Sequence, residues 1–163
     1  MNGKLRNMTA IYLFKKGKVL LLYREGGSVV NEVWTGSAGG HFEKDELNDA
    51  KACVLRELNE ELGLQPEDID SLTLRYIALR STNGEIRQNY YFFAELKEYV
   101  DEKLSSNEGR CQWFSLDEIG SLEMPLSAKY VMEHYCKIGS MTEAIYVGVA
   151  GPEKMDFCEL KET

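Results

Sequence analysis

The sequence predicts a single α/β domain in which a mixed β-sheet is packed between helices. Segments rich in β-branched and aromatic residues, which are typical of strands, lie on both sides of one strongly marked helix at residues 48–62. The 163 residues contain no internal repeat and no low-complexity segment, and a chain of this length can bury a substantial core. We therefore expect one domain over residues 1–163, ending in a hairpin-like tail at about residues 140–163.

The composition is that of an acidic globular protein. Asp and Glu total 27 against 19 Lys and Arg, which gives a formal net charge of −8, so generic binding to nucleic-acid polymers or anionic membranes is disfavoured. The four cysteines show no C-x-x-C spacing, which is typical of reduced, mostly buried thiols. Because we find no signal-peptide-like segment and no apolar run of membrane-spanning length, we expect a cytoplasmic protein.

The first predicted elements form a β-hairpin. We expect residues 1–7 to be a loose lead-in, followed by strands at residues 9–14 and 19–23 that are joined by a turn. The second strand is apolar without alternation, as is usual for a strand that is buried on both faces. Arg24 closes this strand, and a salt bridge at the rim of a site is the favoured interpretation of it.

A pair of glycines comes before the helix. A flexible loop is expected at residues 25–28, and Val29 and Val30 then lead towards Gly39 and Gly40. Because glycine has no Cβ, such a pair suits a backbone that must come very close to a metal ion or a phosphate group.

The helix at residues 48–62 has clear ends and one apolar face. Asn48 or Asp49 can cap its N-terminus, and Gly63 can cap its C-terminus. Apolar residues repeat every four positions and form the face that we expect to be buried: Ala50, Val54, Leu58 and Leu62. The helix can therefore pack on a sheet while its polar edge faces a cleft.

Three acidic residues project from one face of this helix. Glu57, Glu60 and Glu61 have the spacing i, i+3, i+4, and carboxylates held that close repel one another unless a positive charge lies between them. Arg56 is one candidate for that charge. A divalent cation such as Mg²⁺ is the other, because it takes oxygen ligands and is often shared with substrate phosphates. The alternative, a solvated charged face, is the usual meaning of an isolated acidic pair.

The second half of the chain predicts more strands and one more helix. Strands are expected at residues 72–79 and 88–96, joined by an Asn-Gly turn. After a polar loop at residues 99–109, residues 111–119 predict a strand that runs into a capped helical turn, and a helix follows at residues 127–136. The aromatic side chains of residues 88–96 are expected mostly in the core, although one or two could stack on a nucleobase.

The tail predicts two short strands, at residues 144–149 and 156–160. They can form a terminal hairpin because a Gly-Pro pair lies between them. Such a hairpin could complete the sheet, cover a cleft or pair across a dimer, and the sequence leaves these three roles open.

The stretch from Gly40 to Leu64 resembles the signature of the Nudix hydrolases, G-x5-E-x7-R-E-U-x-E-E-x-G-U, in which U is an aliphatic residue. The first half departs from this pattern. The family has a glutamate eight residues before the arginine, where this chain has Asn48, whereas Glu46 lies ten residues before it. Gly40 and Glu46 keep the family spacing of six, so a two-residue insertion after Glu46 is the simplest account. The second half matches at every fixed position: Arg56, Glu57, Leu58, Glu60, Glu61, Gly63 and Leu64.

The resemblance implies the Nudix α/β/α sandwich with a mixed central sheet and a MutT-like pyrophosphohydrolase. It also implies a Mg²⁺ cofactor, with Mn²⁺ as an alternative, and an ion pair through which Arg56 orients the acidic cluster. In the family, helix carboxylates and a backbone carbonyl at the glycine pair bind the metal. Carried over to this chain, the metal ligands are Glu57, Glu60, Glu61 and the Gly40 carbonyl, with Gly39 as the second choice.

Further site residues follow from the same resemblance. Arg24 corresponds to an arginine that lies near the phosphate pocket in the family. A phosphate contact is therefore the alternative to the salt bridge as the role of Arg24. Family members often have a glutamate just before the strand that begins near residue 111, and it binds metal or positions water. Glu108 is the candidate here and Glu102 the second choice, with a solvated loop acid as an equal alternative. Residues expected near the substrate are Arg24, Gly39, Gly40 and Glu46.

The implied reaction is cleavage of a nucleoside diphosphate that is linked to a further group X. A (d)NTP or an oxidised (d)NTP, cleaved to the monophosphate and pyrophosphate, is the first choice, and Glu57 or Glu108 would accept the proton of the attacking water. ADP-ribose or a nucleotide sugar is an alternative. A non-catalytic nucleotide sensor is another, although the intact acidic cluster argues against it. The expected partner is a small nucleotide bound by a monomer or homodimer, with no nucleic-acid polymer and no membrane.

Overall fold

The computed structural model describes residues 3–26 and 32–163. The loop positions Gly27 and Ser28 and the segment Val29 and Val30 lie outside the described residues. The strands are β1 (Lys4–Lys15), β2 (Lys18–Arg24), β3 (Val33–Thr35), β4 (Ile69–Thr82), β5 (Glu85–Leu96), β6 (Gly109–Ser115), β7 (Ile145–Ala150) and β8 (Met155–Leu160). The helices are α1 (Ala50–Leu62) and α2 (Leu126–Lys137), with short 3-10 helices η1 (Lys44–Glu46), η2 (Pro66–Asp68), η3 (Leu116–Ser121) and η4 (Gly139–Met141).

The strands of the described ranges form one mixed sheet of eight. Its order is β3-β2-β1-β5-β4-β7-β8, and β6 pairs with the free edge of β2. The pairs β1–β5 and β4–β7 are parallel, and the other neighbours are antiparallel. On the opposite edge of β2, β1 pairs with residues 18–20 and β3 with residues 22–24. The predicted mixed sheet is therefore confirmed.

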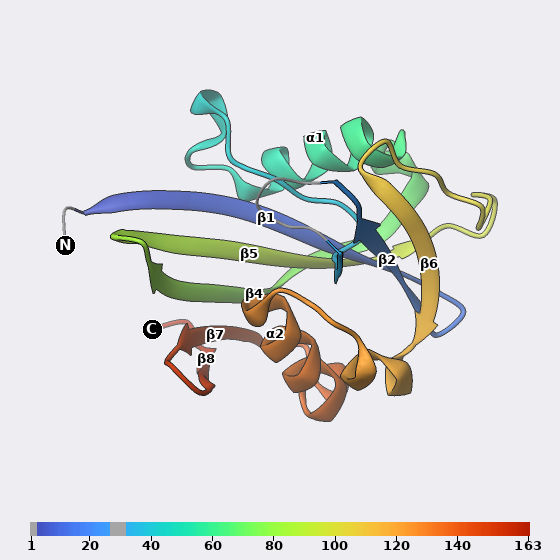
Figure 1. The fold of residues 1–163 in the computed structure, drawn as a ribbon. Helices are drawn as coiled ribbons and strands as arrows, with labels where there is room; N and C mark the ends of the chain where they lie inside the picture. Colours follow the sequence, from blue (N-terminus) through green and yellow to red (C-terminus); the bar gives the residue numbers. More distant parts are fainter. Residues whose placement is uncertain (1–2, 27–31) are drawn as a thin grey trace.

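Helices cover both faces of the sheet, as Figure 1 shows with α1 above it and α2 below it. Side chains alternate along β1, so that Ile11 and Leu13 face α1 whereas Tyr12 and Phe14 face α2. The α1 side is filled by residues such as Leu58 of α1, and the α2 side by residues of α2 such as Val131 and Met132. The domain is thus a single α/β/α sandwich, as the sequence predicted.

Helix α1 has the caps and the buried face that the sequence predicts. The Asp49 carboxylate accepts a hydrogen bond from the backbone N–H of Ala52 at 2.9 Å, which satisfies one of the free donors of the first turn. Gly63 adopts φ 69° and donates its N–H to the carbonyl of Asn59, a conformation that favours glycine. Because both ends are fixed, the acidic residues of the helix keep a fixed position relative to the sheet.

The prediction of a loose N-terminal lead-in is wrong. Strand β1 begins at Lys4, and its residues 4–7 pair in parallel with residues 85–88 of β5. Strand β5 starts directly after the Asn83–Gly84 turn, earlier than expected, and so supplies backbone partners for this polar segment. The segment is a strand because a long-range neighbour satisfies its backbone, although its own residues give a weak strand signal.

The predicted C-terminal hairpin is confirmed. Strands β7 and β8 are antiparallel, and β7 pairs in parallel with β4. Of the three roles that the sequence left open, the hairpin takes the first, because it completes one edge of the sheet. None of the helices in residues 3–26 and 32–163 is long and apolar enough to cross a membrane.

Candidate active site

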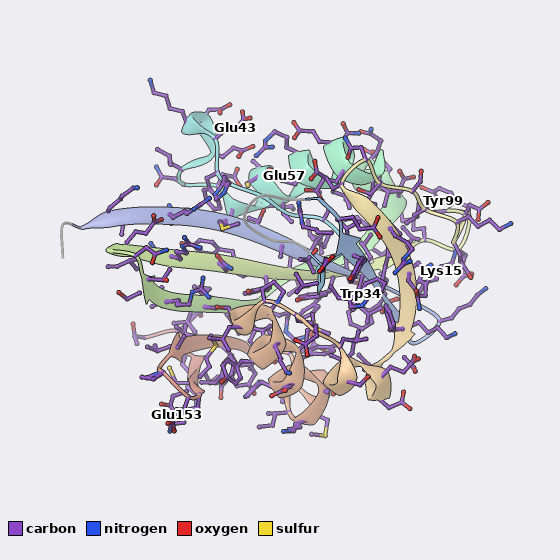
Figure 2. All side chains as sticks on the ribbon, viewed as in Figure 1. Lys15, Trp34, Glu43, Glu57, Tyr99 and Glu153 are labelled. Atoms are coloured by element: carbon purple, nitrogen blue, oxygen red, sulfur yellow. The ribbon has the colours of Figure 1, made fainter. Side chains whose placement is uncertain are left out.

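A cavity of about 680 Å³ lies between the N-terminal half of the sheet, the 36–43 segment and the acidic edge of α1. This volume is within the range of small-molecule sites, about 300–1,000 Å³. The cavity is lined by residues of β1, β4 and β5 and by the first residues of α2. Figure 2 shows the labelled Glu57 on α1 and the labelled Glu43 on the segment before it.

The glycine pair fits tightly between β1 and the acidic helix. Residues 38–41 run antiparallel to β1, where the N–H of Thr9 donates to the carbonyl of Gly40 at 2.8 Å. Gly39 has φ 153°, and a Cβ at this position would overlap the carbonyl oxygen of Thr9. A Cβ on Gly40 would overlap the Glu57 carboxylate. Gly39 is therefore needed for packing on β1, and Gly40 for the close approach of a carboxylate.

Glu57 and Glu61 line the cavity beside this glycine pair, as predicted. Their side chains are only 11% and 9% exposed. Burial raises the pKa of Glu61 to about 7, although the neighbouring Arg24 opposes this shift, and burial also raises the pKa of Glu57. Oε2 of Glu61 is buried and has no hydrogen-bond partner within the part of the chain that is described. The pair thus contains a buried oxygen that has no hydrogen-bond partner among the described residues.

Arg56 forms the centre of a network that fixes this cluster. Its Nε and Nη2 donate to the two oxygens of Glu46 at 2.6 and 3.0 Å. Its Nη1 donates to Glu57 at 2.8 Å and to Glu60 at 3.0 Å, and Nη2 also donates to the carbonyl of His41 at 3.0 Å. The predicted ion pairing of Arg56 with the helix carboxylates is therefore observed.

Glu46 is buried beneath Arg56 rather than facing the cavity. It is 6% exposed, and its Oε2 also accepts the backbone N–H of Glu43 at 2.9 Å. The hydrogen bonds from Arg56 hold the pKa of Glu46 well below its usual range, at about 2. Both oxygens of Glu46 are engaged within the protein, so its contacts are those of an anchor for Arg56.

Glu60 differs from the other two helix carboxylates. Its side chain is 55% exposed, and it contacts Arg56, whereas Glu57 and Glu61 line the cavity. The three acidic residues share one face of α1, as their spacing predicts, but Glu60 is not among the residues that line the cavity.

Arg24 joins α1 to the residue just before β6 at the edge of the cavity. Its Nη2 lies 3.2 Å from Oε1 of Glu61, and its Nη1 lies 3.1 Å from Oε2 of Glu108. Gly109 is opposite Arg24 in the sheet, and a Cβ there would overlap the carbonyl of Tyr23. Gly109 therefore lets β6 begin close to β2, which brings Glu108 beside Arg24. The predicted salt bridge of Arg24 is observed.

The second-choice acid, Glu102, lies elsewhere. It pairs with Lys16 at 2.7 Å, whereas Glu108 lines the cavity together with Arg24 and Glu61. Of the two acidic candidates in the loop at residues 99–109, Glu108 lines the cavity and Glu102 does not.

The sequence did not single out several polar residues of the cavity. Alternate positions of three adjacent strands supply them: Arg6, Arg80, Arg87 and Asn89. These residues lie on the same face of paired strands. The alternation of side chains along each strand indicates which residues of that strand share a face. The register between strands, which brings residues of different strands together, could not be read from the sequence.

The donor set suits a hard divalent cation. Within the described residues, no three His, Cys, Asp or Glu side chains are already arranged to hold a metal ion, and arginines contact several of the carboxylate oxygens. The carboxylates of Glu57, Glu60 and Glu61 and the carbonyls of the glycine pair offer oxygens, which Mg²⁺ and Mn²⁺ prefer. Oε2 of Glu61 is buried and has no hydrogen-bond partner in the described part of the chain, and Glu57 comes close to Gly40. Both features are compatible with a cation at this position.

A family model for the NUDIX domain matches residues 4–135 of the chain. The protein belongs to the Nudix hydrolase family. It is accordingly a Nudix pyrophosphohydrolase, and the Gly40 to Leu64 stretch of its sequence is the Nudix signature with a two-residue departure in the first half.

Solved structures with the same fold confirm the Nudix architecture. A MutT protein from Bacillus halodurans has a TM-score of 0.64 and 21% identity, over 94% of this chain and 97% of that one. A Caenorhabditis elegans Ap4A hydrolase has a TM-score of 0.63 and 18% identity, over 85% of this chain and 99% of that one. An ADP-ribose pyrophosphatase from Streptococcus suis has a TM-score of 0.58 and 20% identity, over 89% and 98%.

These Nudix structures carry different substrate names, so the shared fold selects no single substrate for this chain. No curated protein matches the sequence.

Proposed function

We propose that the protein hydrolyses the diphosphate of a nucleoside diphosphate linked to a group X, in a reaction that depends on Mg²⁺ or Mn²⁺. A (d)NTP or oxidised (d)NTP, cleaved to the monophosphate and pyrophosphate, is the first candidate. The observation that carries the proposal is the position of two buried carboxylates, Glu57 and Glu61, against the Gly39–Gly40 turn in a cavity of about 680 Å³. Buried carboxylates without enough cationic partners are costly, and they suit a site that a cation completes.

Glu57 and Glu61 would hold the metal from the cavity wall, and the more exposed Glu60 would reach it from the same face of α1. The carbonyl of Gly39 is a better candidate ligand than that of Gly40. The Gly40 carbonyl is already bonded to Thr9 in β1, whereas the Gly39 carbonyl lies 3.5 Å from Nη2 of Arg24 at the cavity edge. When bound, the metal would supply positive charge that neutralises the diphosphate and makes the attacking water more acidic.

Two arginines would position the acidic groups. Arg56 keeps Glu57 and Glu60 close to each other although both are negative. Arg24 lines the cavity between Glu61 and Glu108, so its guanidinium can turn to a phosphate oxygen of a bound substrate. Guanidinium groups bind phosphate through charge-assisted hydrogen bonds. Arg24 is thus proposed as a phosphate contact in addition to its observed salt bridges.

The chemical step needs a proton acceptor for the attacking water. The new bond forms between the water oxygen and one phosphorus, the bond from that phosphorus to the bridging oxygen breaks, and a carboxylate takes the water's proton. Glu108 and Glu57 both line the cavity and are both candidates. A general base of this kind contributes about 10²–10⁴-fold to a rate. Glu108 is not among the proposed metal ligands, so a loss of this size in Glu108→Gln would assign the base to Glu108.

The other candidates for the substrate are ADP-ribose and nucleotide sugars. The structural likeness to an ADP-ribose pyrophosphatase and to an Ap4A hydrolase supports testing these compounds beside the triphosphates. The expected partner is in each case a small nucleotide.

A panel of nucleotides with and without Mg²⁺ tests the proposal. The release of phosphate or pyrophosphate is measured for the wild type and for Glu57→Gln, Glu60→Gln and Glu61→Gln. We expect hydrolysis of at least one compound that is lost in EDTA and is reduced at least 100-fold in Glu57→Gln and Glu61→Gln. Unchanged hydrolysis in these variants would rule out the site, and tight nucleotide binding without turnover would instead support a sensor.

A further inference from the structure

Three arginines form a row on the floor of the cavity. In the sheet, Arg6 of β1 lies opposite Arg87 of β5, and Arg87 lies opposite Arg80 of β4. Directly opposite residues on neighbouring strands point to the same face, with their Cβ atoms about 5 Å apart. All three side chains line the cavity. The sheet thus places three guanidinium groups side by side in one hollow, and we call this group the arginine row.

The arginine row is poorly neutralised by the protein. Within residues 3–26 and 32–163, its one ion pair joins Arg87 to Glu85 at 3.8 Å, and Glu85 is shared with Lys4 at 3.6 Å. Arg6 contacts the His41 imidazole, with 2.6 Å between Nη2 and Nε2. In the same described part of the chain, the buried Nε of Arg87 has no hydrogen-bond partner. Like charges at opposite positions destabilise a sheet, so this arrangement is unfavourable without an added anion.

The arginine row is separate from the acidic end of the cavity. Thr9, which bonds to Gly40, lies three residues along β1 from Arg6, and three strand residues span about 10 Å. The arginines at the acidic end, Arg24 and Arg56, are each paired with carboxylates. Because the backbone of Arg6 lies about 10 Å from the glycine turn, the arginine row can take an anion from a part of the ligand other than the diphosphate at that turn.

We propose that the arginine row binds a phosphate group of the substrate that is separate from the diphosphate being cleaved. A phosphate monoester carries about −1.5 to −2 charge and three strong acceptor oxygens, which suits three guanidinium groups better than a singly charged carboxylate does. This inference rests on the proposed function and narrows its substrate class. The substrate is a nucleoside diphosphate derivative with an additional phosphate on the ribose or on X.

Matched pairs of nucleotides test the arginine row without turnover. Isothermal titration calorimetry in EDTA compares NADP⁺ with NAD⁺, coenzyme A with dephospho-coenzyme A, and guanosine 3′-diphosphate 5′-triphosphate with GTP. Within each pair, the compounds differ only by phosphate remote from the shared diphosphate. The proteins are the wild type, Arg80→Gln and Arg87→Gln, with Arg110→Gln as the control, because Arg110 is exposed on β6 and does not line the cavity.

For at least one pair, we expect the wild type to bind the compound with the additional phosphate at least 10-fold more tightly. This preference should fall below 3-fold in Arg80→Gln and Arg87→Gln and persist in Arg110→Gln. The absence of a preference in all three pairs would overturn the inference. A preference that survives both Gln substitutions would overturn it as well, because the phosphate would then bind elsewhere.

Two further readouts separate this inference from a structural role and from the proposed function. Removal of one charge should leave the thermal midpoint of ligand-free Arg80→Gln unchanged or higher, and a lower midpoint would mean that Arg80 stabilises the fold instead. Hydrolysis with Mg²⁺ is then measured for the same pairs. Turnover without discrimination would refute the arginine row alone, whereas selective binding without turnover would refute the proposed hydrolysis alone.

Discussion

The guanidinium of Arg56 binds both oxygens of Glu46, with 2.6 Å between Nε and Oε1 and 3.0 Å between Nη2 and Oε2. This two-point contact has a fixed geometry, and it joins η1 to α1. Glu46 lies ten residues before Arg56, where the family signature has a glutamate at eight. Residues 47–49 connect η1 to α1, and with this spacing the chain still brings the Glu46 carboxylate to the arginine.

Glu46→Gln should therefore impair activity, although Glu46 is not among the residues that line the cavity. The amide removes the charge that orients Arg56, and Arg56 in turn positions Glu57 and Glu60. We expect kcat to fall about 10–100-fold, as is typical when a partner that orients metal ligands is lost, with a smaller change in KM. Steady-state kinetics check this, with Asp45→Asn as the control, since Asp45 is an exposed neighbour. Equal losses in both variants would contradict the anchoring role.

The same residue predicts how stability depends on pH. Because the folded pKa of Glu46 is about 2, below its ordinary value of 4.5, its contribution is present above pH 4.5 and is lost as the pH falls towards 2. The wild type should be more stable than Glu46→Gln by roughly 2 kcal/mol at pH 7. Urea unfolding should show a smaller difference in unfolding free energy between the two proteins at pH 4 than at pH 7. A difference that is the same at both pH values would argue against a charged anchor.

Gly40→Ala should damage the site more than the fold. The new Cβ would overlap the Glu57 carboxylate, so this side chain must move away from its observed position. We expect activity to fall more than 10-fold, because small displacements of catalytic groups have large effects on rate. The control is Gly120→Ala, where a Cβ would meet nothing within 4 Å. Full activity in Gly40→Ala would show that the close approach of Glu57 is not required.

Glu61 predicts the opposite pH dependence in the absence of metal. Its folded pKa of about 7 lies above the ordinary 4.5, so its ionisation favours the unfolded chain and stability falls between pH 4.5 and 7. In EDTA, Glu61→Gln should match the wild type near pH 4.5 and exceed it at pH 8 by roughly 2 kcal/mol, or about 4–8 °C in thermal midpoint. Thermal melts at the two pH values measure this. If the variant is instead less stable at pH 8, ionisation of Glu61 is not unfavourable in the folded protein, which would contradict this prediction.

The parts of the fold that depend on local pattern could be predicted from the sequence. Helix α1, its Gly63 cap and the acidic face with Glu57, Glu60 and Glu61 follow from spacings within one helix, which also limited the N-cap to Asn48 or Asp49. The strand pairs with tight turns, including the C-terminal hairpin, also follow from local signals.

The parts that depend on long-range register could not be predicted. Arg6 and Arg87 meet because β1 and β5 pair in parallel, and no turn between these two strands fixes their alignment in the sequence. The strand at residues 4–7 was missed for the same reason, since its partner lies in β5. Likewise, the contact of Glu46 with Arg56 depends on the path of the segment between them, which propensities do not specify.

A measurement of Mn²⁺ binding tests the central claim most directly. Binding is detected as a decrease in the electron paramagnetic resonance signal of unbound Mn²⁺. We expect the wild type to bind Mn²⁺, and a nucleoside diphosphate to tighten that binding. Glu57→Gln and Glu61→Gln should weaken Mn²⁺ binding at least 10-fold, whereas Glu102→Gln, away from the cavity, should leave it unchanged. Equal affinity in all four proteins would mean that the acidic edge of α1 does not hold the metal, and the proposed catalytic site would be wrong.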